Sequence, residues 1–161
     1  MFRCALLLLF LSACGGEKDV SFTSEPPRGP SIYLVYEATE ATNQRFAVHA
    51  TGIEAIYGVA FRLGYDSDAL RYQTARASAD WPADAIALAR EAEPGTLWVV
   101  WTARGAHDGL ANAGKLGEIE FSHTPGASSD LHFRLERSSV FTARGVPVRD
   151  VAWLGGELVA P

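Results

Sequence analysis

Glu118 and Glu120 are two side chains whose spacing could support acid–base chemistry. They are separated by one residue within LGEIEFS (116–122), an alternating segment typical of a β-strand. On a strand both carboxylates lie on one face, about 6.5–7 Å apart, which suits the paired carboxylates of a glycosidase. Any solvated strand face has the same appearance, and this second interpretation is favoured.

Two further patterns resemble ligand-binding loops only in part. Asp66 and Asp68 could contribute to a calcium loop, but the Gly and Glu of an EF-hand are absent from its sixth and twelfth positions. A turn closed by Asp side chains is the simpler prediction. The segment GLANAGK (109–115) has the glycine spacing of a phosphate loop, but Leu116 replaces the hydroxyl residue and a strand follows instead of a helix.

The remaining reactive side chains show no catalytic grouping. The four histidines are scattered at positions 49, 107, 123 and 132, which predicts surface residues and no metal site. The sequence contains no Gly-x-Ser-x-Gly elbow to support a serine nucleophile. We therefore predict a protein that is not an enzyme and that carries no cofactor.

Cys14 lies at the end of a secretory signal. Arg3 supplies a positive charge, residues 5–11 are apolar and small residues follow. The run is too short to span a bilayer, which requires about 20 residues. The segment Leu-Ser-Ala-Cys (11–14) resembles the lipobox of bacterial lipoproteins; the alternative is a plain signal peptide with an incidental cysteine.

The lipobox resemblance implies a lipid anchor on Cys14. Diacylglycerol would join the thiol, and cleavage after residue 13 would leave Cys14 as the new N-terminus. Several acyl chains anchor a protein stably without spanning the membrane. Gly15 and Gly16 follow, where an Asp after the cysteine would imply inner-membrane retention. The predicted location is the cell envelope, at the outer membrane if the source is Gram-negative.

Composition restricts the partners of the mature chain. Loss of Arg3 leaves 13 basic against 19 acidic residues, a formal charge of −6, and no basic run is present. Nucleic acid and anionic lipid headgroups require a basic patch, so both are excluded as partners. Cys4 leaves with the signal and Cys14 carries lipid, so no disulfide is expected.

The rest of the chain divides into a tether and one domain. Residues 14–30 comprise the lipidated cysteine and a polar segment rich in Gly, Ser and Pro, which we interpret as a flexible linker. Residues 31–161 contain about nine short β-prone segments, which predicts an antiparallel β-sandwich. These segments are 31–37, 44–50, 55–65, 69–75, 96–102, 116–122, 130–136, 139–143 and 152–159.

The alternation within these segments predicts which side chains form the core. Residues 59, 61, 63 and 65 make one apolar row, as do 119 with 121, and 131, 133 with 135. TLWVVWT (96–102) is apolar on both faces and is predicted to be central or covered. In residues 81–95, Ala, Ile and Leu recur at helical spacing between two prolines, which predicts one short helix at about 83–91.

Several motifs resemble cohesin domains. IYGVAFRLGYDSDALRY (56–72) is similar to the cohesin pattern of a motif glycine, apolar alternation, Tyr-Asp and Leu, here Gly58, Tyr65-Asp66 and Leu70. EPGTLWVVWT (93–102), GKLGEIEFS (114–122) and GGELV (155–159) resemble later cohesin strands. The resemblance implies a nine-stranded jelly-roll sandwich that binds dockerin modules and is not an enzyme. Related sandwiches bind carbohydrate, so a polysaccharide is the alternative ligand.

The same resemblance implies a partner-binding face. In cohesins one sheet meets the partner, and carried onto this chain it includes 55–65, 96–102 and 116–122. The outward residues implied are Arg62, Trp98, Glu118 and Glu120. Alternatively, Trp98 packs beneath the predicted 81–95 helix as part of the core.

Overall fold

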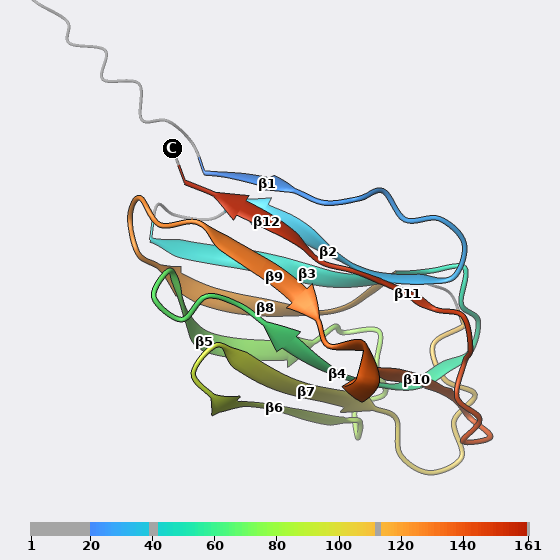
Figure 1. Cartoon of the computed structure of the whole chain (residues 1–161). Coiled ribbons are helices and arrows are strands. Elements are labelled where there is room, and N and C mark those ends of the chain that lie inside the picture. The colour runs from blue at the N-terminus through green and yellow to red at the C-terminus, as the bar shows by residue number, and fades with distance from the viewer. Residues whose placement is uncertain (1–19, 39–41, 112–113, 161) are drawn as a thin grey trace, which may run out of the picture.

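A computed structural model describes residues 20–38, 42–111 and 114–160 of the chain. Within these residues the protein consists of β-strands and one turn of 3-10 helix (Figure 1). In chain order the elements are β1 (Ser21–Thr23), β2 (Ser31–Ala38), β3 (Asn43–Thr51), β4 (Ile56–Gly64), β5 (Leu70–Ala77), β6 (Ile86–Glu93), β7 (Thr96–Thr102), β8 (Lys115–His123), β9 (Ser129–Phe133), η1 (Leu135–Arg137), β10 (Ser139–Thr142), β11 (Ala152–Leu154) and β12 (Gly156–Val159).

The strands form two sheets that pack face to face (Figure 1). The larger sheet has the order β1-β12-β9-β4-β7-β6, with β10 also paired to β4. The smaller sheet has the order β11-β2-β3-β8-β5. Every pairing is antiparallel except that of β11 with β2, which is parallel. The predicted all-β sandwich is confirmed, with twelve strands in the described residues where the sequence predicted nine.

The core fills the space between the sheets, and its largest members are aromatic. Phe61 on β4 contacts Trp101 on β7, and Phe46 on β3 contacts Phe121 on β8, all four side chains being buried. The predicted row at 59, 61, 63 and 65 is buried throughout. Strand alternation thus places one side of each sheet in the core and leaves the other to solvent.

The predicted helix at 83–91 is wrong, because these residues lie in and before strand β6. Leu88 and Arg90 point outward, whereas Ala89 lies opposite the buried Val99 and is partly buried. The alanines that indicated a helix are the small residues on the inward side of an edge strand. The Pro-Gly pair after Glu93 forms a two-residue hairpin turn, with Gly95 at φ +79°, a conformation that suits glycine.

The predicted tether contains a strand that the sequence analysis did not expect. Residues 21–23 form β1, which pairs with β12 through Phe22 and Leu158. The Phe22 ring lies 5.2 Å from the ring of Phe46 and 6.1 Å from that of Tyr36. Packing of this one aromatic side chain explains why so short a strand is ordered in a polar segment.

Two strand ends also differ from the prediction. The segment predicted over 130–136 leaves the sheet after Phe133 and enters η1, which leaves Leu135 exposed instead of buried. The segment predicted over 152–159 is two strands that separate at Gly155, where a β-carbon would lie 1.9 Å from the carbonyl oxygen of Leu131. β11 therefore joins the smaller sheet and β12 the larger one.

The predicted signal peptide, Cys14 and the linker up to residue 19 lie outside the described residues. Among the residues that are described, no helix has the length and apolarity needed to cross a bilayer.

Candidate functional site

Arg62 and Trp98 lie side by side on the outer face of the larger sheet. Cross-strand register places Arg62 of β4 and Arg90 of β6 on either side of Trp98 on β7, the strand that lies between them. The guanidinium carbons of Arg62 and Arg90 are 4.0 Å and 4.7 Å from the centroid of the indole ring. We call these three residues the cationic row; their contacts are cation–π interactions.

A second row, two residues further along the same strands, is apolar. It consists of Ala60, Val100 and Leu88, which are also in cross-strand register. Val100 is 36% exposed and Leu88 61% exposed, although both are aliphatic. We call these residues the apolar row.

A groove of about 380 Å³ adjoins the apolar row between β4, β7 and β10. Gly58, Ala60 and Phe141 are among its lining residues. The groove is deep at Gly58 because this residue has no side chain to fill it. A β-carbon at this position would lie only 2.8 Å from Oγ1 of Thr102. The outer face therefore combines exposed aliphatic side chains with a concave surface beside them.

Arg134 follows β9, donates its backbone N–H to the carbonyl oxygen of Arg62, and already has side-chain partners. Its guanidinium donates a hydrogen bond of 3.0 Å to Oγ1 of Thr96 and lies 3.8 Å from a carboxylate oxygen of Glu93. In contrast, neither Arg62 nor Arg90 forms an ion pair within the described part of the chain.

Glu118 and Glu120 do not belong to this face, which corrects the sequence-based assignment. They lie on β8, which pairs with β3 and β5 in the smaller sheet. Lys115 lies 2.9 Å from Glu37 and 3.2 Å from Glu118, so Glu118 takes part in an ion-paired surface. The two glutamates are on a polar strand face, the interpretation that the sequence analysis favoured over a carboxylate pair.

The other candidate ligand groups have local structural roles. Oδ1 of Asp66 accepts a 2.8 Å hydrogen bond from the backbone N–H of Asp68, which forms the predicted turn. His123, predicted at the surface, is instead 5% exposed, with Nε2 2.7 Å from the carbonyl oxygen of Ala127. No group of three or more His, Cys, Asp or Glu residues that could hold a metal is present within the described ranges.

Among the described residues, clear pKa shifts fall on two tyrosines, one lysine and one histidine. Burial raises the pKa of Tyr65 and Tyr72, and Tyr65 also donates a hydrogen bond to Glu91. Hydrogen bonding to Glu37 raises the pKa of Lys115. Desolvation, helped by the nearby charge of Lys115, lowers the pKa of His49.

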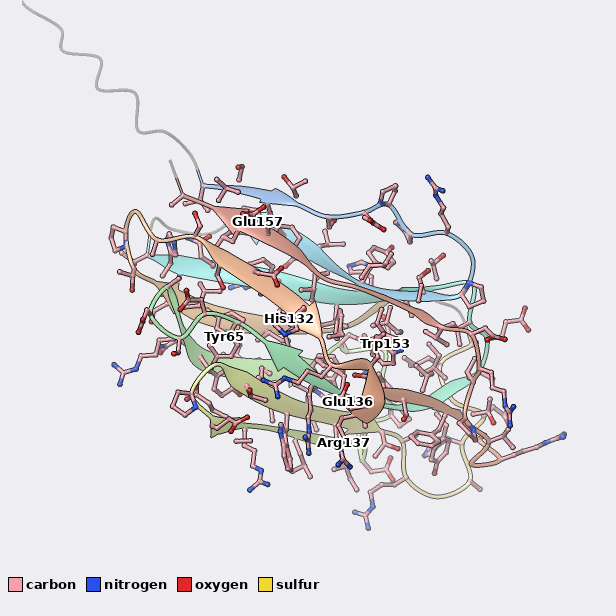
Figure 2. All side chains as sticks on the ribbon, in the orientation of Figure 1. Tyr65, His132, Glu136, Arg137, Trp153 and Glu157 are labelled. Atoms are coloured by element: carbon pink, nitrogen blue, oxygen red, sulfur yellow. The ribbon has the colours of Figure 1, made fainter. Side chains whose placement is uncertain are left out.

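A second cleft of about 570 Å³ lies toward the opposite edge of the larger sheet. His132 of β9, Trp153 of β11 and Glu157 of β12 are among its lining residues (Figure 2). Trp153 also contacts Phe61 and Phe133, so its ring closes the core as well as lining the cleft. Nδ1 of His132 is 3.1 Å from Asp130, another residue of this cleft.

Sequence reasoning missed Arg90, Leu88 and the groove. A signal for the first two was present, because Ile86, Leu88 and Arg90 recur at the period of a strand immediately before a Pro-Gly turn. The groove depends on the pairing of β10 with β4, which no local pattern specifies.

Comparison with solved structures identifies the fold. The sixth cohesin of scaffoldin B from Acetivibrio cellulolyticus is similar over 83% of this chain and 100% of its own, with a TM-score of 0.69 and 16% identity. A type II cohesin from the same organism is similar over 82% of this chain and 95% of its own, with a TM-score of 0.70 and 13% identity. A non-cellulosomal cohesin from Archaeoglobus fulgidus is similar over 80% of this chain and 89% of its own, with a TM-score of 0.63 and 16% identity.

No family model matches the chain, and no curated protein does. At sequence identities of 13–16%, the similarity to these cohesins shows a shared three-dimensional fold alone. The chain has the fold of cohesin domains.

Proposed function

We propose that this protein is a non-catalytic binding module that holds a protein partner on the outer face of its larger sheet. The observation that carries the proposal is the apolar row beside the groove, where Val100 and Leu88 are exposed on neighbouring strands. Contiguous exposed apolar surface next to polar residues is characteristic of interaction sites.

The similar solved structures support a protein as the ligand. One of them is a cohesin in complex with a Cel5 dockerin, and another is the third cohesin of ScaC in complex with the ScaB dockerin from Acetivibrio cellulolyticus. A partner similar to a dockerin therefore belongs to the proposal.

The alternative ligand, a polysaccharide, is less well supported by the surface. A flat sugar-binding platform uses exposed aromatic rings. The large hydrophobic side chains that are exposed in the described residues are aliphatic, and Trp98 is covered in part by two guanidinium groups.

The proposal includes membrane attachment through lipid on Cys14, after removal of a signal peptide formed by residues 1–13. Because β1 begins at Ser21, six residues separate Cys14 from the folded domain. Fully extended, they reach about 20 Å. The domain would then lie close to the membrane surface of the cell envelope.

Capture of the partner from detergent-solubilised membranes tests the binding face. The Leu88→Gln/Val100→Gln variant keeps the net charge and removes the two exposed aliphatic side chains. We expect it to capture about tenfold less partner than wild type. A matched control, Val35→Gln, alters an equally exposed valine (36%) on β2 of the smaller sheet. If Val35→Gln captures less partner and the double variant does not, the binding face lies on the smaller sheet and the proposal is wrong.

Metabolic labelling with a fatty-acid analogue tests the anchor. Wild type should be labelled and fractionate with membranes, whereas Cys14→Ser should be unlabelled. Equal labelling of the two proteins would eliminate the lipid anchor.

A further inference from the structure

We infer that two copies of this chain associate edge to edge through antiparallel pairing of their β6 strands, so that the two larger sheets become one continuous sheet. The contact is made by the backbone at the margin of each sheet, and both outer faces stay open to solvent. The inference goes beyond the proposed function, because it requires no other protein.

β6 is an unprotected strand at the margin of the larger sheet (Figure 1). It pairs with β7, and no second strand pairs with it in the described part of the chain. Seven of its eight residues are exposed. Proteins usually block such edges with lysine, proline, a bulge or an inward charge, because the unpaired N–H and C=O groups invite another strand. Between Ile86 and Arg90 none of these is present, since the bulge and the inward Glu91 come after Arg90.

The other sheet edges in the described residues are protected against pairing. β1 and β11 are only three residues long. β5, the edge of the smaller sheet, is interrupted by a bulge between Tyr72 and Thr74. Short or bulged strands offer a poor template for another chain. Among the described strands, β6 is therefore the edge best suited to accept a strand.

The sequence of β6 is complementary to itself when a two-fold axis passes through Leu88. Antiparallel pairing about this axis places Leu88 opposite Leu88 of the second copy, Ile86 opposite Arg90, and Ala87 opposite Ala89. Leu88 and Ile86, which are 61% and 38% exposed in the single chain, each gain an aliphatic neighbour. The apolar row then continues across the axis into the apolar row of the second copy.

Charge favours the same register. Asp84, two residues before the strand, lies diagonally across from Arg90 of the second copy, within reach of a long side chain. Its carboxylate is exposed and 3.4 Å from Nε2 of His107, whereas Arg90 has no ion pair within the described ranges. Other axes fit less well. An axis at Ala89 brings the two Arg90 side chains together, and an axis at Ala87 pairs only three residues of each strand.

The expected association is weak and reversible. Pairing of residues 86–90 alone gives a small interface, and interfaces that bury less than about 1,200 Å² in total are typical of transient complexes. We expect a dimer to form at protein concentrations of about 0.1–1 mM.

Cysteine cross-linking of the full chain, in an excess of detergent micelles, tests the inference. In Leu88→Cys the two β-carbons face each other across the axis at about 4.5–5.5 Å, close to the spacing of a disulfide. Under a mild oxidant, we expect covalent dimer to form about tenfold faster than with Val35→Cys. Val35 is the matched control, because it is exposed on β2 of the smaller sheet. Wild type measures the background from Cys4 and Cys14.

Mixed variants and a charged variant test the register. Ile86→Cys and Arg90→Cys should each cross-link slowly alone, because identical positions are four residues out of register, about 13–14 Å apart. A mixture of the two should cross-link rapidly, because these positions are opposite each other. Leu88→Lys places two lysines at the axis and should weaken dimerisation about tenfold in sedimentation equilibrium, whereas Val35→Lys should not.

Each contrary result overturns a definite part of the inference. If Leu88→Cys cross-links no faster than Val35→Cys, the β6 edges do not pair. If Val100→Cys cross-links faster than Leu88→Cys, the two copies meet through their outer faces. If the mixture of Ile86→Cys and Arg90→Cys shows no advantage over either alone, the antiparallel register is wrong. The partner protein is absent from these experiments, so none of their results bears on the proposed binding face.

Discussion

Replacing Phe61 by alanine should severely destabilise the domain. Phe61 is 2% exposed and lies between the two sheets. Its ring contacts Trp101 and Phe133 edge-on at centroid distances of 5.7 Å and 5.3 Å, and Trp153 at 6.4 Å. These three partners come from β7, β9 and β11, so one side chain joins strands of both sheets.

The expected loss is about 4–5 kcal/mol, the upper part of the range for truncating a buried phenylalanine. The cost depends on how far neighbours collapse into the cavity. Trp101 is held by its packing over Gly117, where a β-carbon would approach the indole to 2.5 Å, and it cannot move toward β8. Each aromatic pair adds about 0.5–1.5 kcal/mol beyond the buried area, and three pairs are lost.

Urea unfolding of residues 20–161, followed by tryptophan fluorescence and far-UV circular dichroism, measures this loss. Coincident transitions and an unchanged m-value would show that two-state analysis applies. Arg62→Ala is the control on the same strand, because it points outward and should cost at most about 1 kcal/mol. A loss under 1 kcal/mol for Phe61→Ala would refute the assigned core and with it the register of β4.

Three other predictions concern separate parts of the fold. Phe22→Ala should cost about 1–2.5 kcal/mol by urea unfolding, less than for a fully buried phenylalanine, and no loss would show that β1 does not contribute to the fold. Gly117→Ala should cost about 1–3 kcal/mol through overpacking against the carbonyl oxygen of Arg76 and the indole of Trp101, whereas a neutral result would mean that both neighbours can shift. The lowered pKa of His49 means that the unfolded chain takes up its proton first, so stability should fall as pH drops through about 6.5. His49→Gln should show a smaller fall over that window in thermal unfolding, and identical pH profiles would exclude His49 as a cause.

Strand alternation was sufficient to predict most of the fold, because the core lies between two sheets and each strand has one buried face. Phe61, Ile119 and Leu131 were assigned inward on this basis and are buried. Local pattern failed where small residues occupy the inward positions. Ala87 and Ala89 are compatible with an edge strand and with a helix. Only the pairing of β6 with β7 decides between these two structures.

The candidate site was predicted only in part, because it depends on which strands are neighbours. Arg62 and Trp98 were both assigned outward, and their strands do pair. Glu118 and Glu120 were assigned to the same face, yet β8 belongs to the smaller sheet. Alternation gives the side of a strand on which a residue lies, but sheet membership is set by contacts between distant segments.

Charged side chains are paired differently on the outer faces of the two sheets, and the requirements of folding alone do not account for this difference. On the smaller sheet Lys115 binds both Glu37 and Glu118, as expected for a solvated surface. On the larger sheet Arg134 binds Glu93, but Arg62 and Arg90 share one tryptophan and have no acid among the described residues, next to aliphatic side chains exposed to water. Replacing Arg90 by a glutamate would pair Arg62 and should cost the fold nothing, since exposed ion pairs contribute about 0–1 kcal/mol. If Arg90→Glu unfolds at an equal or higher temperature and yet captures less partner from detergent-solubilised membranes, Arg90 contributes to binding and not to folding. If it lowers the unfolding temperature, the stack on Trp98 is a structural element, and the argument from unpaired charge fails.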